Sequence, residues 1–487
     1  MAHSRGSVTG SESSRLLAPL VLLALVIFSI AARIPLILSH VRLEYGDGVY
    51  GASAIALRHG APPFREVFSS QGPIFLPLVR AFDALGFQTL WAPRLAAAVA
   101  GIVLVVATFA LTRRAGTIAG ATAAAALIAF SPIVLDVSTQ LQSDAIAVAF
   151  ATVAVWLAAG TRTDEPEWWR IVMVGLASGC ALGVKGPLVG PPIAVALWLI
   201  LRRRGSLSAL GAGVVAVCVP LLASLPWGIR NVWTQAVAMR LRAAHPDPVQ
   251  NLRDLSYQFR ANDAVLLVCF VLAVALFVYR MTREQSGIGS VKAVMRLPNG
   301  DVIIAVAIWL ILQGLTMLAY SPLLNQHSIY LLIPMAVLVG VGVSVLERPW
   351  IWVVPLVLLA AGWQVTQSDA FRSIEPNGDE VAAMEDLHSI HPLGAKVISD
   401  EPGLTWWAGR VTPGPLVDTS PVRIDTGSLT LQGVVDAAAK QDVCAILVWS
   451  GYFDRLGDLA RALPDYERVR DYGIGRYLLL RRSCSLS

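Results

Sequence analysis

The stretch APRLAAAVAGIVLVVATFALT, residues 92–112, decides the fold class of this chain. Its last 18 residues carry no charge, and at a rise of 1.5 Å per residue they form a helix of about 27 Å. The hydrocarbon core of a bilayer is about 30 Å thick, so an apolar helix of this length predicts a membrane span. Arg113 and Arg114 follow it directly, which is typical of the cytoplasmic end of a span.

The composition extends this conclusion to the whole chain. Of its 487 residues, 55% are hydrophobic and 15% are charged, and the mean hydropathy is +0.63. Soluble domains carry about 25% charged residues, so one large water-soluble globule is excluded, as are collagen, coiled coil, disordered chain and disulfide scaffold. The net charge of +5 is small and follows membrane topology, so we expect no nucleic-acid partner.

Hydropathy predicts eleven membrane helices, near residues 16–38, 92–112, 117–135, 144–160, 168–184, 187–202, 207–229, 263–281, 301–320, 328–346 and 350–366. If the N-terminus is cytoplasmic, fourteen Lys and Arg residues fall in the inside segments, and the short outside loops hold only Lys185. This bias follows the positive-inside rule and predicts a multi-pass protein of the cell (inner) membrane. An odd number of spans then places the C-terminal region outside.

The chain divides into a cytoplasmic tail (1–15), a transmembrane module (16–366) and an extracytoplasmic domain (367–487). The last region is more polar, with helix-like pieces near 379–390, 431–440 and 454–463 and β-like runs near 395–399, 444–449 and 476–480. Gly and Pro turns separate these pieces. The predicted fold class is therefore an all-α polytopic membrane protein with a small C-terminal α/β domain.

The five cysteines point in two directions. Cys180, Cys218 and Cys269 fall in apolar segments, and we expect them to be buried thiols. Cys444 and Cys484 lie in the polar C-terminal region. An oxidising compartment would allow these two to pair, but the odd number of cysteines does not lead us to expect a disulfide framework.

The first outside segment, LEYGDGVYGASAIALRHGAPPFREVFSSQGPIFLPLVRAFDALGF (43–87), is too polar to span the membrane. Apolar residues nevertheless repeat in it at helical spacing, first from Val49 to Ala56 and then from Phe64 to Leu78. The pattern predicts two short amphipathic helices that lie in the membrane interface. Asp47 stands at the start of the first helix, where its carboxylate either caps the helix or serves chemistry.

Four groups of residues, in one order along the chain, give a more specific indication. They are the acidic residue and Tyr50 outside the first span, followed by HGAPPFREVFSSQGPIF and APRLAAAVAG; SPIVLDVSTQLQSDAIAVAF; GVKGPLVGPP; and NQHSIYLLIPMA. This series resembles the lipid-dependent glycosyltransferases of the GT-C superfamily, in particular bacterial relatives of protein O-mannosyltransferases and lipid A aminoarabinose transferases. The resemblance covers roughly residues 16–366.

The resemblance implies an inverting glycosyltransferase of the cell envelope. It would move a sugar from a polyprenyl-phosphate carrier to a hydroxyl of an extracytoplasmic glycan, lipid or protein. The resemblance makes Asp47 the base that takes the acceptor proton. It places Asp144 in the same cavity, where it orients acceptor or base, whereas the alternative is a helix N-cap formed with Ser143. The implied substrate-binding residues are Glu44, Tyr50, Gln142 and Tyr330; Glu44 otherwise is surface charge.

A lipid phosphate at such a site needs cations around it. The resemblance assigns this role to Lys185, whose alternative is to snorkel toward ordinary lipid headgroups. Gln71 stands where aminoarabinose transferases have a lysine, and it brings no charge. Arg65, Arg230 and His327 are therefore further candidates for phosphate binding, each otherwise an interfacial anchor. We expect residues 230–262 to form a hinged segment over the cavity.

We expect neither a metal nor another cofactor, because the seven histidines are scattered and no CxxC or HExxH spacing occurs. The expected partners are the polyprenyl-phosphate sugar, its acceptor and membrane lipids. Two other functions fit a chain of this kind: a secondary transporter, and an envelope glycan ligase on another scaffold. Transporters tend to have two repeated halves and charges near the midplane, whereas here the polar residues collect at the outside ends.

Overall fold

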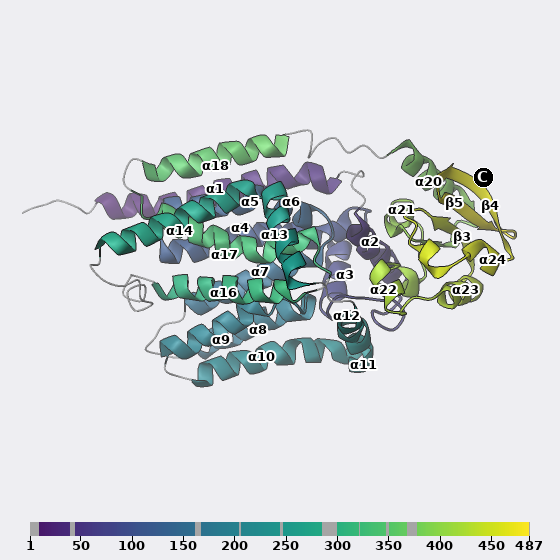
Figure 1. Cartoon of the computed structure of the whole chain (residues 1–487), viewed down its shortest axis with the longest axis horizontal. Coiled ribbons are helices and arrows are strands. Elements are labelled where there is room, and N and C mark those ends of the chain that lie inside the picture. Colours follow the sequence, from purple (N-terminus) through teal and green to yellow (C-terminus); the bar gives the residue numbers. More distant parts are fainter. Residues whose placement is uncertain are drawn as a thin grey trace, which may run out of the picture.

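The computed structural model describes residues 9–38, 44–160, 167–203, 206–243, 247–284, 300–320, 322–346, 350–367 and 377–486. Figure 1 shows a bundle of long helices at one end and a smaller part with strands at the other. Helices α2 (Tyr45–Arg58) and α21 (Pro402–Trp407) lie where the two meet. The chain therefore has a junction at which both parts contribute side chains.

Each of the eleven predicted spans contains a helix. They are α1 (Thr9–Leu38), η1 with α4 (Ala92–Arg94 and Leu95–Ala115), α5 (Ile118–Phe130), α7 (Ser143–Ala159), α8 (Trp168–Val184), α9 (Gly190–Arg203), α10 (Ser206–Ser224), α14 (Ala264–Glu284), α16 (Gly300–Leu318), α17 (Ile329–Val343) and α18 (Trp350–Gln367). Among the described residues, five helices are long and apolar enough to cross a membrane, or up to seven if two bent pairs are counted as spans. The chain is thus a multi-pass membrane protein.

The two bent pairs lie at the end of the bundle that is nearer the C-terminal part (Figure 1). In one, α5 continues after a 57° bend into α6 (Pro132–Thr139). Ser131 makes this bend by accepting a hydrogen bond from Val134 N at 3.2 Å, with proline in the next position, as is favoured at a helix start. In the other, α13 (Pro248–Asn262) meets α14 at 105°. Both bends turn the chain sideways close to the junction.

Small residues set the spacing inside the bundle. Helix α5, IAGATAAAALIAF, is buried from Ala119 to Phe130. A Cβ added to Gly120 would lie 2.2 Å from the carbonyl oxygen of Gly340 on α17. Close backbone approach through small residues is the usual packing mode of membrane helices. Small residues therefore let the backbones of α5 and α17 pack closely against each other.

Helix α2 forms where the first interfacial helix was predicted, but it is not the half-exposed amphipathic helix that the pattern suggested. Residues Asp47 to Leu57 of α2 are all buried, because α21 covers the face that the sequence pattern left polar or small. A Cβ on Gly51 would lie 2.0 Å from the ring of Trp406, and one on Gly48 would lie 2.4 Å from the backbone nitrogen of Gly403. The glycines of YGDGVYG thus allow the C-terminal part to pack against the helix.

The second predicted interfacial helix is shorter than the pattern suggested. Helix α3 covers Phe75–Leu85, but Phe64 and Phe68 precede it in a non-helical loop. Phe64 has a positive φ of 59°, and its backbone nitrogen donates a hydrogen bond to the Val67 carbonyl at 2.8 Å. Both phenylalanines pack inward from this loop, which explains why they are apolar without being helical.

The C-terminal part is a small α/β fold, as the sequence predicted. Its sheet has the order β2 (Lys396–Ser399), β3 (Val443–Val448), β5 (Arg476–Arg481), β4 (Tyr466–Gly473), with β2 and β3 parallel and the other pairs antiparallel. Strands β1 (Ile390–His391) and β6 (Ser485–Leu486) form a separate pair. The helices are α20 (Gly378–Ser389), α21, α22 (Pro421–Asp425), α23 (Leu431–Lys440) and α24 (Leu459–Ala462), with short turns η5 (Gly414–Leu416) and η6 (Phe453–Leu456). The edge strand β4 was missed because most of its side chains are exposed and charged.

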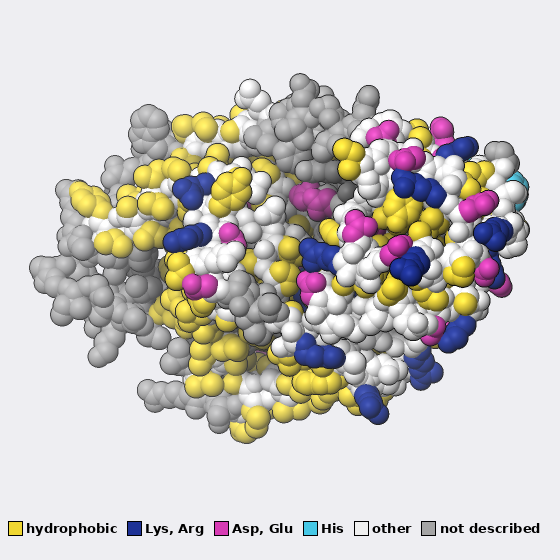
Figure 2. Space-filling view, turned by 45° about the vertical axis from the view of Figure 1, so that its right-hand side comes forward, with side chains coloured by type: hydrophobic (Ala, Val, Ile, Leu, Met, Phe, Trp, Pro, Cys, Tyr) yellow, Lys and Arg dark blue, Asp and Glu magenta, His cyan; other side chains and the backbone are white. Residues whose placement is uncertain are grey.

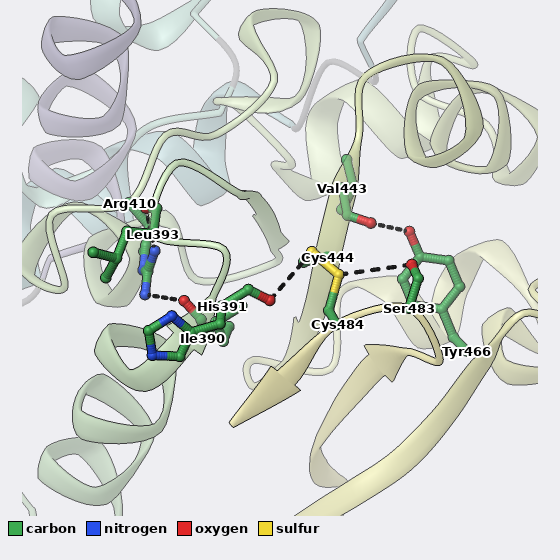
Figure 3. Close-up of a disulfide and its surroundings, with 9 residues drawn as sticks. All are labelled: Ile390, His391, Leu393, Arg410, Val443, Cys444, Tyr466, Ser483 and Cys484. Carbon is green, nitrogen blue, oxygen red and sulfur yellow. Dashed lines mark hydrogen bonds between the residues drawn. A yellow bond between two sulfur atoms is a disulfide. The ribbon is translucent and has the colours of Figure 1, made fainter. Parts of the chain in front are cut away.

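Two expectations about the cysteines are wrong. Cys444 and Cys484 form a disulfide that ties the start of β3 to the segment after β5, across 40 residues of sequence (Figure 3). Cys218 is exposed and Cys180 and Cys269 are half-buried. Apolar segments do not imply burial in this chain, since the outer faces of membrane helices are meant to meet lipid.

Glu401, just before α21, carries a pH dependence that can be measured. Burial, together with the nearby charges of Asp400 and Glu380, raises the pKa of its carboxyl from 4.5 to about 8. The unfolded chain releases this proton near 4.5 while the folded chain keeps it to about 8, so Glu401 lowers stability progressively as pH rises through that window. Glu401→Gln should flatten the fall of Tm between pH 5 and 8. Exposed Glu467→Gln is the control, and equal slopes for both variants would contradict the prediction.

Candidate active site

A cavity of about 580 Å³ lies at the junction, between the outer ends of the bundle and the C-terminal domain; we call it the hollow. It is lined from the membrane side by residues that include Glu44, Tyr50, Gln71, Gln142, Lys185, Arg240 and His327, and from the C-terminal domain by Asp418, Ser420, Asp425 and Tyr452. Figure 2 shows charged side chains gathered over the C-terminal part and hydrophobic ones over the bundle. The hollow therefore lies where an apolar surface meets a polar one.

A second, smaller cavity of about 180 Å³ adjoins the hollow; we call it the slot. Most of its walls are apolar, with Leu182, Pro220, Leu221, Ile229, Val232 and Trp233 among them. Four polar residues line both cavities: Ser70, Gln71, Lys185 and Arg240. The boundary between an apolar space and a polar one thus carries two cationic side chains.

Lys185 ends α8, where it is buried rather than snorkelling, with 5% of its side chain exposed. Its ammonium group lies 3.2 Å from Oδ2 of Asp144 and 3.2 Å from the hydroxyl of Ser143. The hydroxyl of Tyr330 donates to Oδ1 of the same carboxylate. Asp144 therefore is not an N-cap but the centre of a buried network, in which the lysine provides its counter-charge.

His327 belongs to the same network. Its Nδ1 accepts a hydrogen bond from Leu324 N at 3.0 Å, which leaves the proton of a neutral ring on Nε2. Nε2 faces Asp144 at 3.9 Å, and the ring stacks against Tyr330 with centroids 5.7 Å apart. The structure thus brings together the predicted residues Lys185, Asp144, His327 and Tyr330.

Gln71, Tyr50 and Ser143 link this network to α2. The amide nitrogen of Gln71 donates to the Tyr50 hydroxyl at 2.5 Å, and its oxygen accepts from Ser143 Oγ at 3.1 Å. Gln142 lines the hollow beside Gly46, where a Cβ on the glycine would lie 2.8 Å from the Gln142 amide. Glu44, the N-cap residue of α2, also lines the hollow. All four predicted substrate-binding residues, Glu44, Tyr50, Gln142 and Tyr330, lie at or directly behind this cavity.

Asp47 lies behind the wall of the hollow. Its carboxylate is fully buried and paired with Arg94, whose Nε is 3.1 Å from Oδ2. Leu141 N donates to Oδ1 at 2.6 Å. Asp47 is therefore not the N-cap of α2, since it lies three residues after Glu44 in the first turn. Its neighbours Gly46 and Tyr50 line the hollow, but Asp47 itself does not.

Arg94 was not singled out in the sequence. Its guanidinium also reaches the Ile37 carbonyl at 3.1 Å and lies over the rings of Trp406 and Trp407, at 5.2 and 5.1 Å from their centroids. The Arg94–Asp47 pair thus joins α1, α2, η1 and α21. The two tryptophans pack against α2 and Arg94.

Two predicted phosphate-binding residues are not at the hollow. Arg65 is exposed and lines another cavity, and Arg230 on α11 (Ile229–Val232) is exposed at the surface. Arg240, on α12 (Met239–Arg242), lies where they were expected. It donates to Tyr320 OH at 2.9 Å and to the Ser70 carbonyl at 3.4 Å. The π-helical turn η3 (Trp233–Ala238) before α12 sets which side faces inward, and no sequence pattern signals that turn.

The segment after α10 closes this side of the junction. The side-chain oxygen of Gln235, on η3, accepts a hydrogen bond from Ser69 N at 3.0 Å, and its amide nitrogen donates to the Phe64 carbonyl at 2.8 Å. Met239 and Arg240 line the hollow, so part of the 230–262 segment lies over it; that the segment is hinged stays a prediction. Asp247 caps α13 through Val249 N at 2.8 Å, and His245 lies outside the described residues.

In the part of the chain that the structure describes, no three His, Cys, Asp or Glu side chains come together in a way that could hold a metal ion. The residues at the hollow are instead suited to anions on one side and to hydrogen-bonding groups on the other. Lys185 and Arg240 supply positive charge at the slot boundary. Glu44, Asp418 and Asp425 supply carboxylates elsewhere on the wall.

Comparison with known proteins finds a partial match to one family model and several solved structures of similar fold. Residues 70–229 match the model of the dolichyl-phosphate-mannose-protein mannosyltransferase family. The search of curated proteins gives no significant match. Among solved structures, ArnT from Cupriavidus metallidurans bound to undecaprenyl phosphate matches with a TM-score of 0.62 and 13% identity, over 97% of this chain and 98% of that one.

Archaeal oligosaccharyltransferases match as well. The Archaeoglobus fulgidus enzyme in complex with Zn and sulfate gives a TM-score of 0.58 and 15% identity, over 94% of this chain and 72% of that one. AglB of the same organism, in complex with an inhibitory peptide and a dolichol-phosphate, gives 0.55 and 13%, over 93% and 73%. The chain therefore shares its overall fold with these lipid-phosphate-binding and oligosaccharyltransferase structures.

Proposed function

We propose that this protein is an inverting glycosyltransferase that moves a sugar from a polyprenyl phosphate to an extracytoplasmic acceptor hydroxyl. The observation that carries the proposal is the slot. An apolar cavity that adjoins the hollow, with Lys185 and Arg240 in the lining of both, fits a ligand with a hydrocarbon chain, an anionic phosphate and a polar head, in that order. The lipid phosphates bound to ArnT and AglB are ligands of this kind.

The reaction needs few chemical groups. The acceptor oxygen attacks the anomeric carbon as the bond from that carbon to the phosphate oxygen breaks, and the lipid phosphate leaves with the electron pair. A carboxylate takes the proton of the acceptor hydroxyl. Cations that are already in place stabilise the charge that develops on the leaving phosphate, without reorganisation during the reaction. One displacement of this kind inverts the anomeric centre.

The residues divide naturally between these tasks. Lys185 and Arg240 hold the phosphate, and Asp144 keeps the lysine charged and oriented. Tyr50, Gln71, Gln142 and Glu44 contact the sugar or acceptor in the hollow. Asp47 is the proposed base; its carboxylate is paired with Arg94, and Gly46 and Tyr50 on the same helix line the hollow. Each Asp47 oxygen has two acceptor directions, and both are taken: Oδ1 accepts from Leu141 N and Arg94 Nε, and Oδ2 accepts from Arg94 Nε and Nη2. For Asp47 to act as the base, the acceptor hydroxyl must replace one of these contacts.

Replacing Arg240 tests the donor site. Arg240→Gln should weaken binding of a polyprenyl-phosphate sugar by about 10-fold or more, because a hydrogen bond to a charged group contributes about 1.5–3 kcal/mol. Arg242→Gln is a matched control, since Arg242 is exposed on the same short helix. Binding of radiolabelled donor and the KM for donor in a transfer assay measure the effect. Equal binding by the two variants would remove Arg240 from the donor site.

The same assay separates this function from transport. A glycosyltransferase releases the free lipid phosphate when donor and acceptor are both present. A transporter leaves the sugar–phosphate bond intact. Purified protein that binds the donor but never cleaves it, with any acceptor extract of the cell envelope, would overturn the proposal.

A further inference from the structure

A larger cavity, of about 990 Å³, lies beside the hollow, between the loop after α2 and the C-terminal domain. We call it the outer groove. It includes Arg65, the arginine that the hollow does not use, and it lies beside the Cys444–Cys484 disulfide shown in Figure 3. The reaction described above assigns it no role.

Positive side chains reach the outer groove from four separate places. Arg65 comes from the loop after α2, Lys396 from β2, Lys440 from the end of α23, and Arg481 from the end of β5. The carboxylates in its lining are Glu66 and Asp442. Four cations against two carboxylates give the lining a net positive charge.

Two of these cations are available to a ligand. Lys440 lies 3.6 Å from Asp436, and Lys396 donates to the side-chain oxygen of Gln441 at 3.4 Å. Within the described ranges, the guanidinium groups of Arg65 and Arg481 form no hydrogen bond or ion pair. Arg65 is exposed and Arg481 is half-buried, so both can turn toward an anion in the groove.

The outer groove and the hollow share a wall. Pro415 lines the groove and Asp418 lines the hollow, and three residues of chain span at most about 11 Å. On the other side of the wall, Glu66 lines the groove and Ser70 the hollow, four residues apart, which is at most about 14 Å. A ligand long enough to fill the groove therefore needs only a short extension to reach the hollow.

This shared wall is rigidly held. Phe68 N donates a hydrogen bond to the Gly414 carbonyl at 3.0 Å. This bond joins the two loop segments that form the wall. Arg423 lies over the Phe68 ring, 3.7 Å from its centroid, and donates to the Pro415 carbonyl at 2.8 Å. The geometry that relates the two cavities is thus fixed by contacts between the membrane module and the C-terminal domain.

We propose that the outer groove binds an anionic glycan, and that this glycan is the acceptor whose hydroxyl enters the hollow. The inference rests on the proposed function. Uronate or phosphate groups on the glycan would face Arg65 and Arg481, and its hydroxyls would meet the polar lining. No described residue that lines the groove is apolar and larger than valine, so a lipid chain has no surface to cover there, in contrast to the slot.

A binding experiment tests this without any turnover. The full chain is placed in nanodiscs of zwitterionic lipid, and a short fluorescent oligogalacturonate is titrated, with its methyl ester as the neutral counterpart. The acid form should bind at least 10-fold more tightly than the ester and weaken with salt, since exposed charge pairs are screened. Equal affinity for acid and ester, or no binding of either, would overturn the proposal.

Variants locate the site. Arg65→Gln with Arg481→Gln should raise the Kd for the oligogalacturonate about 10-fold, the combined effect of two exposed charge pairs of up to about 1 kcal/mol each. The control pair, Arg253→Gln with Arg461→Gln, removes the same charge from exposed positions outside the groove and should leave the Kd unchanged. Equal effects of both pairs would reduce the attraction to general surface charge and overturn the site. Complete displacement of the probe by added anionic phospholipid would instead make the groove a headgroup site.

The two proposals fail in different ways. If the acceptor assignment is wrong, the groove variants keep the same KM for acceptor, and donor binding and donor cleavage are also unchanged. If the glycosyltransferase function is wrong, donor cleavage is absent while the oligogalacturonate still binds in the groove. With both correct, the groove variants raise the KM for an anionic acceptor and leave the KM for donor unchanged.

Discussion

Asp47→Asn is expected to lower the rate of sugar transfer by about 10²–10⁴-fold, the range for losing a general base. Asparagine keeps an oxygen for the hydrogen bond from Leu141 N but cannot take the acceptor proton. Transfer from a polyprenyl-phosphate sugar, measured at saturating donor, reports the effect. Donor binding should change little, because the proposed phosphate-binding residues Lys185 and Arg240 line the slot and the hollow, whereas Asp47 lines neither.

The Arg94 pair requires a second variant. Asp47→Asn leaves the Arg94 guanidinium buried without its counter-charge, and breaking a buried pair in this way costs about 3–5 kcal/mol. The double variant Asp47→Asn, Arg94→Gln removes both charges, and we expect it to regain stability without regaining turnover. Recovery of turnover in the double variant would mean that Asp47 only holds Arg94, and would end its assignment as the base.

Lys185→Met is expected to weaken donor binding by about 10–100-fold, through loss of a charge-assisted hydrogen bond to the phosphate. It also leaves Asp144 buried without its cation, 3.2 Å from where the ammonium lay. Protein stability should therefore fall together with affinity. Equilibrium binding of labelled donor and thermal unfolding of the same sample measure the two effects.

Neutralising the whole pair separates these effects. Lys185→Met with Asp144→Asn restores electrical balance, so we expect Tm to recover most of its loss while donor binding stays weak. Asp144→Asn alone leaves a buried lysine that a lipid phosphate can neutralise, so donor should raise the Tm of this variant more than that of the wild type. Normal donor binding by the double variant would show that Lys185 serves Asp144 and not the phosphate.

Much of the helical bundle could be predicted from local sequence. A span needs about 20 apolar residues whatever its neighbours are, and each predicted span does contain a helix. The strands near 395–399, 444–449 and 476–480 were also found, since their apolar runs are buried. Strand β4 was not, because an edge strand with exposed, charged side chains lacks such a run.

The site was predicted in part, and the errors have a common cause. Lys185 and Asp144 were assigned from the family resemblance, and the high cost of a charge in an apolar stretch agrees with that choice without knowledge of the fold. Arg65, Arg230 and Arg240 look alike in the sequence, since each lies in a polar loop. Only the packing of these segments decides which arginine faces the hollow. In the structure that residue is Arg240.

The sequence alone determined that this chain lies in a membrane and which polar residues enter its apolar helices, because hydropathy and the cost of burying charge act over a few neighbouring residues. The tertiary structure alone decided that Asp47 faces Arg94, that Lys185 faces Asp144 and that α21 covers α2. These pairs join residues 41 to about 350 positions apart in the chain. Their partners are fixed by how the helices pack, and no local pattern records that.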